Sequence, residues 1–181
     1  MQGSSECAIA VWFTGLPSSG KSTIAKETAK ILRAQGQLVV VLDSDELRCE
    51  LTPDPNYTKK ERDWFYGVLA FMAELLTNSG VTTLIAATAP LREYRDNARK
   101  RIGLFCEVFV KCSLNECRRR DPKGLWAKEK QSKISNLPGA DAPYEQPLEP
   151  ELVVNTEQQS AEKSAQLVAE ALPKKVSRLS N

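Results

Sequence analysis

One octapeptide constrains this chain more than any other feature. Residues 15–22 read GLPSSGKS and fit the pattern GxxxxGK[ST] at every fixed position. The segment follows a β-prone apolar run over residues 9–14 and opens a stretch of helical periodicity over residues 22–35, the strand–loop–helix setting that the motif requires. Glycines in such a loop let backbone N–H groups converge on phosphate oxygens, and the helix N-terminus adds partial positive charge. The segment therefore predicts a phosphate-binding loop (P-loop).

Two side chains of this loop have separate expected roles. We expect the Lys21 ammonium to reach the β- and γ-phosphates of a nucleotide and the Ser22 hydroxyl to ligate Mg²⁺. Mg²⁺ is therefore the expected cofactor of a nucleotide bound at this loop. The loop residues expected to bind ATP are Gly15, Ser18, Ser19, Gly20, Lys21, Ser22 and Thr23.

Beyond the loop, short apolar runs alternate with amphipathic stretches. Strands are predicted at 9–14, 38–42, 81–87, 105–110 and 152–154, and helices at 22–35, 59–78, 92–102, 113–120 and 160–172. Strands that alternate with helices imply right-handed crossovers and a mainly parallel sheet with helices on both faces. We therefore predict an α/β three-layer sandwich formed by a single domain over residues 1–181.

The segment 121–150 interrupts this alternation. It holds five prolines, and three lysines precede residue 131. A segment of this length is long for an ordinary connection, so it is either a functional lid or partly disordered. Because prolines limit backbone freedom and lysines can reach an anion, we favour the lid.

Composition excludes several other chemistries. The chain has no histidine, which removes His-based triads and nearly all His-ligated zinc or iron sites. A net charge of +2 is too balanced for binding nucleic acid by bulk charge, so no nucleic-acid partner is expected.

Five scattered cysteines without a CxxC pair favour a reducing compartment over a disulfide framework. No apolar run approaches the roughly 18 residues of a membrane span, and no signal peptide is visible, so we expect a cytoplasmic protein without a membrane partner.

Asp43 and Asp45 follow directly on the apolar strand that is predicted to end at Leu42. In a parallel sheet, side chains at the carboxyl end of a strand face the ligand. One carboxylate could hold Mg²⁺ through water and the other could accept the proton of an acceptor hydroxyl. The alternative is a helix cap, because Asp45 precedes Glu46-Leu47. We favour the functional interpretation.

The class of P-loop protein follows by elimination. The chain has neither an NKxD-type guanine-reading sequence nor an LSGGQ-type signature, and its 181 residues are few for motor or transporter ATPases. A compact P-loop protein with a basic segment after its fourth strand is typical of small-molecule and nucleotide kinases. In these enzymes a lid excludes water, so the phosphoryl group reaches the acceptor and is not hydrolysed. The predicted fold is therefore that of a P-loop kinase with a lid.

Several segments resemble the adenylylsulfate kinase (APS kinase) family, in order along the chain. They are GLPSSGKS at 15–22, DSD at 43–45 with Arg48, YTKKER at 57–62, APLR at 89–92, RDPKGLW at 120–126 and GADAPYE at 139–145. The resemblance runs from about residue 10 to about residue 156. It implies transfer of the γ-phosphate of ATP to the ribose 3′-hydroxyl of adenosine 5′-phosphosulfate (APS), which gives PAPS in sulfate activation. It also implies Mg²⁺ and a homodimer.

The resemblance assigns roles by position in these motifs. The residues with implied catalytic roles are Lys21, Asp43, Asp45 and Lys123, with Ser22 and Asp43 at the metal. Arg118 and Arg120 lie where the family approaches the ATP adenine. Arg48 and Arg62 fall on arginines expected at the phosphosulfate, whose several acceptor oxygens suit planar guanidinium groups. Tyr57 replaces a phenylalanine that stacks on the substrate adenine. The implied substrate-binding residues are Asp45, Arg48, Tyr57, Arg62, Phe65, Lys123 and Leu137.

Three positions depart from the family pattern. Phe65 stands in place of a substrate-pocket asparagine, and Leu137 replaces one of two aromatic residues that sandwich the adenine. Ala89 replaces a serine proposed as a phosphorylated intermediate, so transfer here is expected to be direct and in-line. Phe65 and Leu137 motivate one alternative, a related kinase that phosphorylates a hydroxyl of another nucleotide-linked substrate. A non-catalytic nucleotide-binding module is the other, although the intact lysines and aspartates disfavour it.

Overall fold

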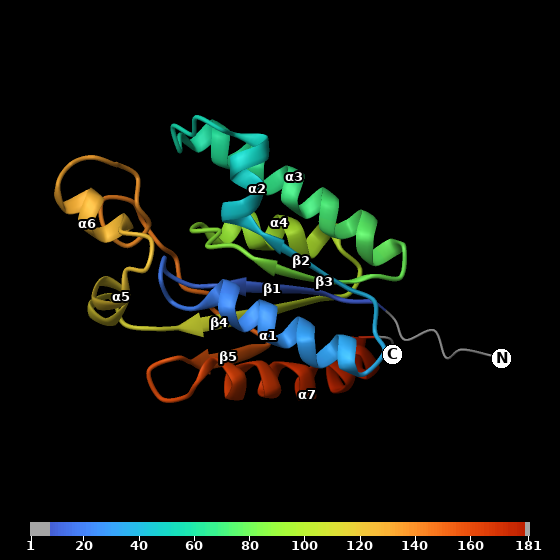
Figure 1. Ribbon diagram of the computed structural model, residues 1–181. Helices are drawn as coiled ribbons and strands as arrows, with labels where there is room; N and C mark the ends of the chain where they lie inside the picture. Colours follow the sequence, from blue (N-terminus) through green and yellow to red (C-terminus); the bar gives the residue numbers. More distant parts are fainter. Residues whose placement is uncertain (1–7, 180–181) are drawn as a thin grey trace.

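The computed structural model describes residues 8–179, with side chains described as far as residue 172; Cys7 lies outside the described residues. Within this range, five strands form one sheet in the order β2-β3-β1-β4-β5, and every pair is parallel. The strands are β1 (Ala10–Thr14), β2 (Val39–Asp43), β3 (Thr82–Ala86), β4 (Phe105–Lys111) and β5 (Leu152–Asn155). Their carboxyl ends therefore meet at one edge of the sheet, on the side of α5 and α6 in Figure 1.

Helices cover both faces of this sheet. They are α1 (Lys21–Ala34), α2 (Ser44–Leu51), α3 (Lys59–Asn78), α4 (Arg92–Arg101), α5 (Leu114–Arg120), α6 (Leu125–Lys130) and α7 (Ala161–Leu179). Figure 1 shows α1 and α7 on one face and α3 and α4 on the other. The predicted α/β three-layer sandwich is confirmed. No helix within residues 8–179 is both long enough and apolar enough to cross a bilayer.

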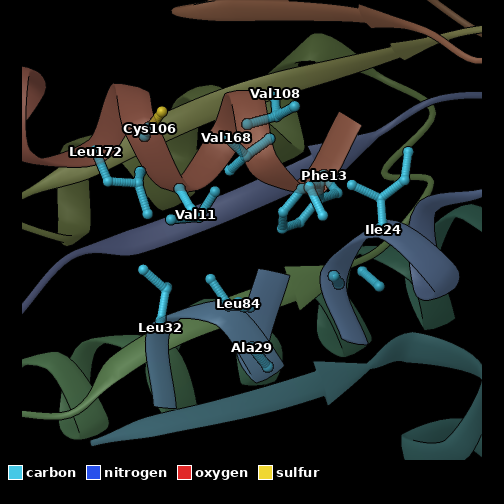
Figure 2. Packing of buried hydrophobic residues seen from close by; sticks show 14 of the residues in the cluster. Val11, Phe13, Ile24, Ala29, Leu32, Leu84, Cys106, Val108, Val168 and Leu172 are labelled. Atoms are coloured by element: carbon cyan, nitrogen blue, oxygen red, sulfur yellow. The ribbon is translucent and has the colours of Figure 1, made fainter. Parts of the chain in front are cut away.

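The central strand explains how the layers are held. Successive side chains of β1 point to opposite faces, because strand periodicity is two. Val11 and Phe13 pack with α1 and α7, as Figure 2 shows, whereas Ala10 and Trp12 pack with α3 and α4. All four are fully buried, and each large apolar side chain contributes roughly 1.5–3 kcal/mol on burial. The loop that follows β1 therefore starts from a strand fixed on both faces.

Two helices were not predicted from the sequence pattern. Helix α2 begins immediately after β2, where the pattern indicates only a cap, and α6 lies inside the segment 121–150. Both are short, so neither contains enough turns to establish a helical period. Helix α7 also continues past the predicted end at Leu172.

Candidate active site

A cavity of about 630 Å³ opens at the carboxyl edge of the sheet, a volume that suits small-molecule ligands. It is lined by the P-loop, the starts of α1 and α2, α3, the end of β3 and the segment 121–150. The predicted site residues that line it are Ser18, Gly20, Lys21, Ser22, Thr23, Asp45, Arg48, Tyr57, Arg62, Arg120, Lys123 and Leu137. The predicted site residues outside its lining are Gly15, Ser19, Asp43, Phe65 and Arg118.

Gly15 and Ser19 shape the P-loop from behind. A Cβ atom at Gly15 would lie 2.5 Å from the backbone oxygen of Val110, and the φ of +157° also disfavours a side chain, so only glycine fits this turn. The Ser19 N–H donates to the Leu16 carbonyl at 3.2 Å, which closes the loop on itself. Gly20, with φ of 104°, then starts α1, whose N-terminal N–H groups open toward the cavity. This arrangement is a built anion site.

Lys21 is held in place by the loop that carries it. Its Nζ donates to the carbonyl oxygens of Gly15 at 3.0 Å and Leu16 at 2.8 Å, and the residue is only 9% exposed. Burial lowers the pKa of Lys21 to about 8, although the Asp45 carboxylate opposes this shift. A desolvated ammonium beside a helix N-terminus attracts an anionic phosphate strongly.

Asp43 and Asp45 have different surroundings. Asp43 is buried, and its carboxylate accepts the Asp45 N–H at 3.0 Å as the N-cap of α2. The cap therefore belongs to Asp43 and not, as the pattern suggests, to Asp45. Asp45 is exposed on the cavity wall, and its carboxylate pairs with the Lys123 ammonium from the segment 121–150. Partial burial lowers the pKa of Lys123, but the hydrogen bond and charge of Asp45 outweigh it, so that pKa is raised overall.

Two arginines from neighbouring helices line the cavity. Arg48 of α2 and Arg62 of α3 are both buried, at 8% exposed. The Arg62 guanidinium donates to the Tyr57 carbonyl at 3.0 Å and to the Asn136 carbonyl at 2.5 Å. Tyr57 adopts φ of 52° in the left-handed region and is 36% exposed. Arg62 thus joins the start of α3 to the segment 121–150.

Phe65 and Arg118 are not brought to the cavity. Phe65 is fully buried beneath Arg48, whose guanidinium carbon lies 3.8 Å from the centroid of its ring. Arg118 is exposed on α5 and lies 5.6 Å from the centroid of the Trp126 ring. Residues three or four apart share one face of a helix, and a seven-residue helix such as α5 presents only part of its arginine run to the ligand. Arg120 is the arginine of α5 that lines the cavity.

The segment 121–150 contributes Pro122, Lys123, Leu125 and residues 134–138 to the cavity lining. Asp121 accepts the N–H groups of Trp126 and Ala127 at 3.2 and 3.0 Å, which secures the start of α6. Trp126 and Leu137 of this segment pack with Cys112 and Cys117 in a small hydrophobic cluster, separate from the two cores that pack on the sheet. These contacts fit the predicted lid, and its action as a lid stays a prediction.

A buried arginine anchors the C-terminal end of the lid. Arg95 of α4 is 1% exposed and donates to Glu107 Oε1 at 2.7 Å, to the Glu145 carbonyl at 2.6 Å and to the Ala89 carbonyl. The Tyr144 hydroxyl lies 3.1 Å from Thr14 Oγ1, one residue before the P-loop. The end of the lid is therefore joined to the same strand that positions Lys21.

Sequence reasoning missed several cavity residues. Thr88 lies two residues beyond the end of β3 and lines the cavity, so the rule that ligands lie at strand carboxyl ends was sufficient to find it. Thr156 follows β5 directly, and its Oγ1 donates to the Ser19 carbonyl at 3.0 Å. Arg120 donates in turn to Thr156 Oγ1 at 2.9 Å, so this threonine connects α5 to the P-loop. Tyr66 of α3 carries no comparable local signal.

Comparison with known proteins identifies the family. The family model described as adenylylsulphate kinase matches residues 7–155. An adenylyl-sulfate kinase of Halothermothrix orenii is 41% identical over 92% of this chain and 90% of its own. The solved Mycobacterium tuberculosis APS kinase CysC, in complex with AMPPNP and APS, is 38% identical with a TM-score of 0.87, over 92% of this chain and 98% of that one. A hexameric APS kinase of Thiobacillus denitrificans is 25% identical with a TM-score of 0.69, over 93% of this chain and 29% of that one. A family match over residues 7–155 and 41% identity to a curated relative over most of both chains show that this chain belongs to the adenylylsulfate kinase family.

Proposed function

We propose that this protein transfers the γ-phosphoryl group of ATP directly to the ribose 3′-hydroxyl of APS, giving PAPS and ADP. One observation carries the proposal: the P-loop with Lys21, the arginine pair Arg48 and Arg62, and the ion pair of Asp45 with Lys123 line one cavity. A phosphate donor at one end and an anionic acceptor at the other would meet at this carboxylate.

The P-loop end supplies the donor site. Backbone N–H groups at the start of α1 and the Lys21 ammonium bind the β- and γ-phosphates, and Arg120 contributes positive charge on the α5 side of the cavity. Two carbonyl oxygens of the loop that would surround the phosphate already hold the Lys21 ammonium. Its charge is therefore in position before the transition state forms.

The residues present suit Mg²⁺. The Ser22 hydroxyl lines the cavity that Asp45 also faces, and Asp43 adds a second carboxylate nearby, so the donors are hard oxygens. The described residues contain no cluster of three or more acidic, cysteine or histidine side chains, so phosphate and water oxygens would complete the coordination. When bound, the ion neutralises charge that develops on the β- and γ-phosphates.

The acceptor end orients the nucleophile. Arg48 and Arg62 bind the phosphosulfate, and the Tyr57 ring and the Leu137 side chain contact the base. The ribose 3′-oxygen attacks the γ-phosphorus, its proton passes to the Asp45 carboxylate, and the bond to the β–γ bridging oxygen breaks to release ADP. Lys123 exchanges its ion pair with Asp45 for the transferring phosphoryl group.

Direct transfer is supported by the surroundings of Ala89. This residue is fully buried, its N–H donates to the Tyr66 hydroxyl at 3.2 Å, and its carbonyl accepts from Arg95. It has no nucleophilic atom, and it lies outside the cavity lining. A two-step route through this position is therefore closed.

The reaction is tested by coupled ADP release with a panel of nucleotide acceptors, followed by mass measurement of the product. APS is expected to be the preferred acceptor, with a mass gain of one phosphoryl group at the 3′ position. Turnover with another nucleotide-linked hydroxyl but not with APS would favour the related-kinase alternative. Binding of ATP with no turnover on any acceptor would identify a non-catalytic module.

A homodimer and a cytoplasmic location complete the proposal. Trp64, Phe71 and Leu75 lie along one side of α3 and are 50%, 44% and 51% exposed, an unusual run of apolar surface for a monomer. A second copy of this chain is the proposed occupant of that face. Sedimentation velocity of the wild type and of Leu75→Lys tests it: the variant is expected to sediment as a monomer.

A further inference from the structure

The guanidinium of Arg48 is enclosed by aromatic rings. Its carbon lies 3.8 Å from the ring centroid of Phe65, 5.0 Å from that of Tyr57 and 5.9 Å from that of Tyr66. The side chain is only 9% exposed. Removing a charge from water in this way is costly unless other groups replace the lost hydration.

Hydrogen bonding replaces only part of that hydration. Arg48 Nη1 donates to Glu61 Oε1 at 3.1 Å, whereas Nη2 is buried and has no partner among the described residues. The other Glu61 oxygen accepts the N–H groups of Asn56 and Tyr57 at 2.8 and 3.1 Å. Glu61 therefore fixes one edge of the guanidinium, and one donor beside the acceptor end of the cavity is left for an anion.

Phe65 supplies the face on which this group rests. Glu61 and Phe65 are four residues apart on α3 and so lie on the same side of the helix. Glu61 contacts one edge of the Arg48 guanidinium, and the Phe65 ring packs against its plane. Together these two contacts define the position and tilt of the guanidinium. The negative face of an aromatic ring attracts a cation most strongly at short range and away from water, both of which apply here.

We propose that Phe65 is a positioning residue that determines affinity for the anionic acceptor by holding the Arg48 guanidinium, without itself touching the substrate. The inference rests on the proposed function, because it assigns Arg48 to the acceptor. Phe65 acts at this end of the cavity only: the donor site depends on the P-loop, which makes no use of the Arg48 platform. Loss of the ring therefore weakens acceptor binding while the bond-forming step and ATP binding persist.

Kinetics of Phe65→Leu test this assignment. The KM for APS is expected to rise roughly 3- to 30-fold, while kcat and the KM for ATP stay within about twofold of wild type. An unchanged KM for APS, or equal losses toward both substrates, would overturn the proposal. Because leucine also leaves space in a packed core, a near-isosteric series at position 65 is needed: phenylalanine with one, two and three ring fluorines, which progressively weaken the negative face. The KM for APS is expected to rise stepwise with fluorination at constant melting temperature, and a flat series overturns the role of the ring.

Phe105→Leu is the matched control. Phe105 is also buried, and the guanidinium carbon of Arg99 lies 4.8 Å from its ring centroid. Phe105 is the first residue of β4, so it lies at the amino end of the strand, whereas the cavity opens at the carboxyl ends. The same substitution there is expected to lower stability and leave the KM for APS unchanged; an equal rise in KM would show that the Phe65 effect is a general loss of packing. Failure of the proposed function is distinguishable, because wild-type protein would then show no turnover with APS. Calorimetric binding of APS to the fluorinated series still decides the role of Phe65 in that case.

Discussion

The P-loop and the lid each place one lysine near Asp45, but the two lysine charges are held by different means. Lys21 is buried, is bonded to two carbonyls of its own loop, and has a pKa lowered to about 8. Lys123 has a side chain 53% exposed, is paired with Asp45 itself, and has a raised pKa. The P-loop keeps its cation in place at a cost in solvation, whereas the lid places its cation by an ion pair that must be exchanged.

This difference separates two tasks within one reaction. A charge that is fixed in advance needs no reorganisation when the transition state forms. A charge held by an exposed carboxylate can follow the lid as it opens and closes. The largest losses are therefore expected on the P-loop side, and graded losses on the lid side.

Removal of the fixed charge is expected to have the largest effect. Lys21→Ala should lower kcat/KM for ATP by about 10³-fold, because a preorganised donor to the phosphates is lost. ADP release measures this directly. Lys26→Ala is the control, since Lys26 lies on the same helix in an exposed pair with Glu46 and should stay within about twofold of wild type. Near-normal activity of Lys21→Ala would refute the role of this lysine.

The carboxylate shared by both lysines comes next. Asp45→Asn should lower kcat by about 10²-fold, because the proton acceptor for the 3′-hydroxyl is removed, while Lys123→Gln should lower it by roughly 10-fold. Single-turnover kinetics with both variants separate the chemical step from lid motion. If Asp45→Asn keeps the wild-type kcat, the proton leaves by another route, and the assignment of Asp45 as the proton acceptor is wrong.

Stability against pH distinguishes the two lysines by sign. The unfolded chain keeps the Lys21 proton up to about 10.5, whereas the folded protein releases it near 8, so unfolding takes up a proton between these values. The cost of burying this charge is thus fully present below pH 8 and declines as pH rises toward 10.5. Lys21→Met should raise the free energy of unfolding by about 1–3 kcal/mol at pH 7, and by less at pH 10.

Lys123→Met should change the free energy of unfolding in the opposite direction and lower it at pH 7. Because the folded pKa of Lys123 is raised, the wild-type lysine stabilises the fold below its unfolded pKa and loses that contribution as pH rises through the folded value. Urea unfolding of both variants at pH 7 and pH 10 provides the measurement. The same direction of change for the two substitutions would contradict the comparison.

The smallest effect is expected at Ala89. Ala89→Ser should change kcat by less than about threefold, because the position is sealed by Tyr66 and the Arg95 network and does not reach the cavity. Mass spectrometry of the variant after incubation with ATP should find no added phosphoryl group. A covalently phosphorylated Ala89→Ser protein would reopen a two-step route.

Sequence reasoning succeeded where the local pattern and the structure depend on the same physics. The P-loop was readable because the glycines at 15 and 20 answer to a backbone requirement, which the clash at Gly15 and the φ of Gly20 now demonstrate. The strands were readable because a sheet covered on both faces needs continuous apolar runs. The strand-end position of Asp43 and Asp45 followed from the same argument.

It failed where the outcome depends on contacts between distant segments. Phe65 occupies a motif position that suggested direct contact, yet the helix turn that carries it places the ring under Arg48, and no linear pattern encodes that layer. The cap at Asp43 depends on one φ and one hydrogen bond, which decide between two adjacent aspartates. The bond from Arg62 to Asn136 spans 74 residues and could not be foreseen.

The small hydrophobic cluster that contains Trp126 and Leu137 of the lid has a consequence for how fast this region opens. Because Cys112, Cys117, Trp126 and Leu137 pack apart from the two cores of the sheet, we expect this region to open as one unit, at a free energy below that of global unfolding. Its amides should exchange with deuterium while those of β1 remain protected. We expect release of the nucleotide product to require such a local opening, so that the packing of these four side chains limits the rate of turnover.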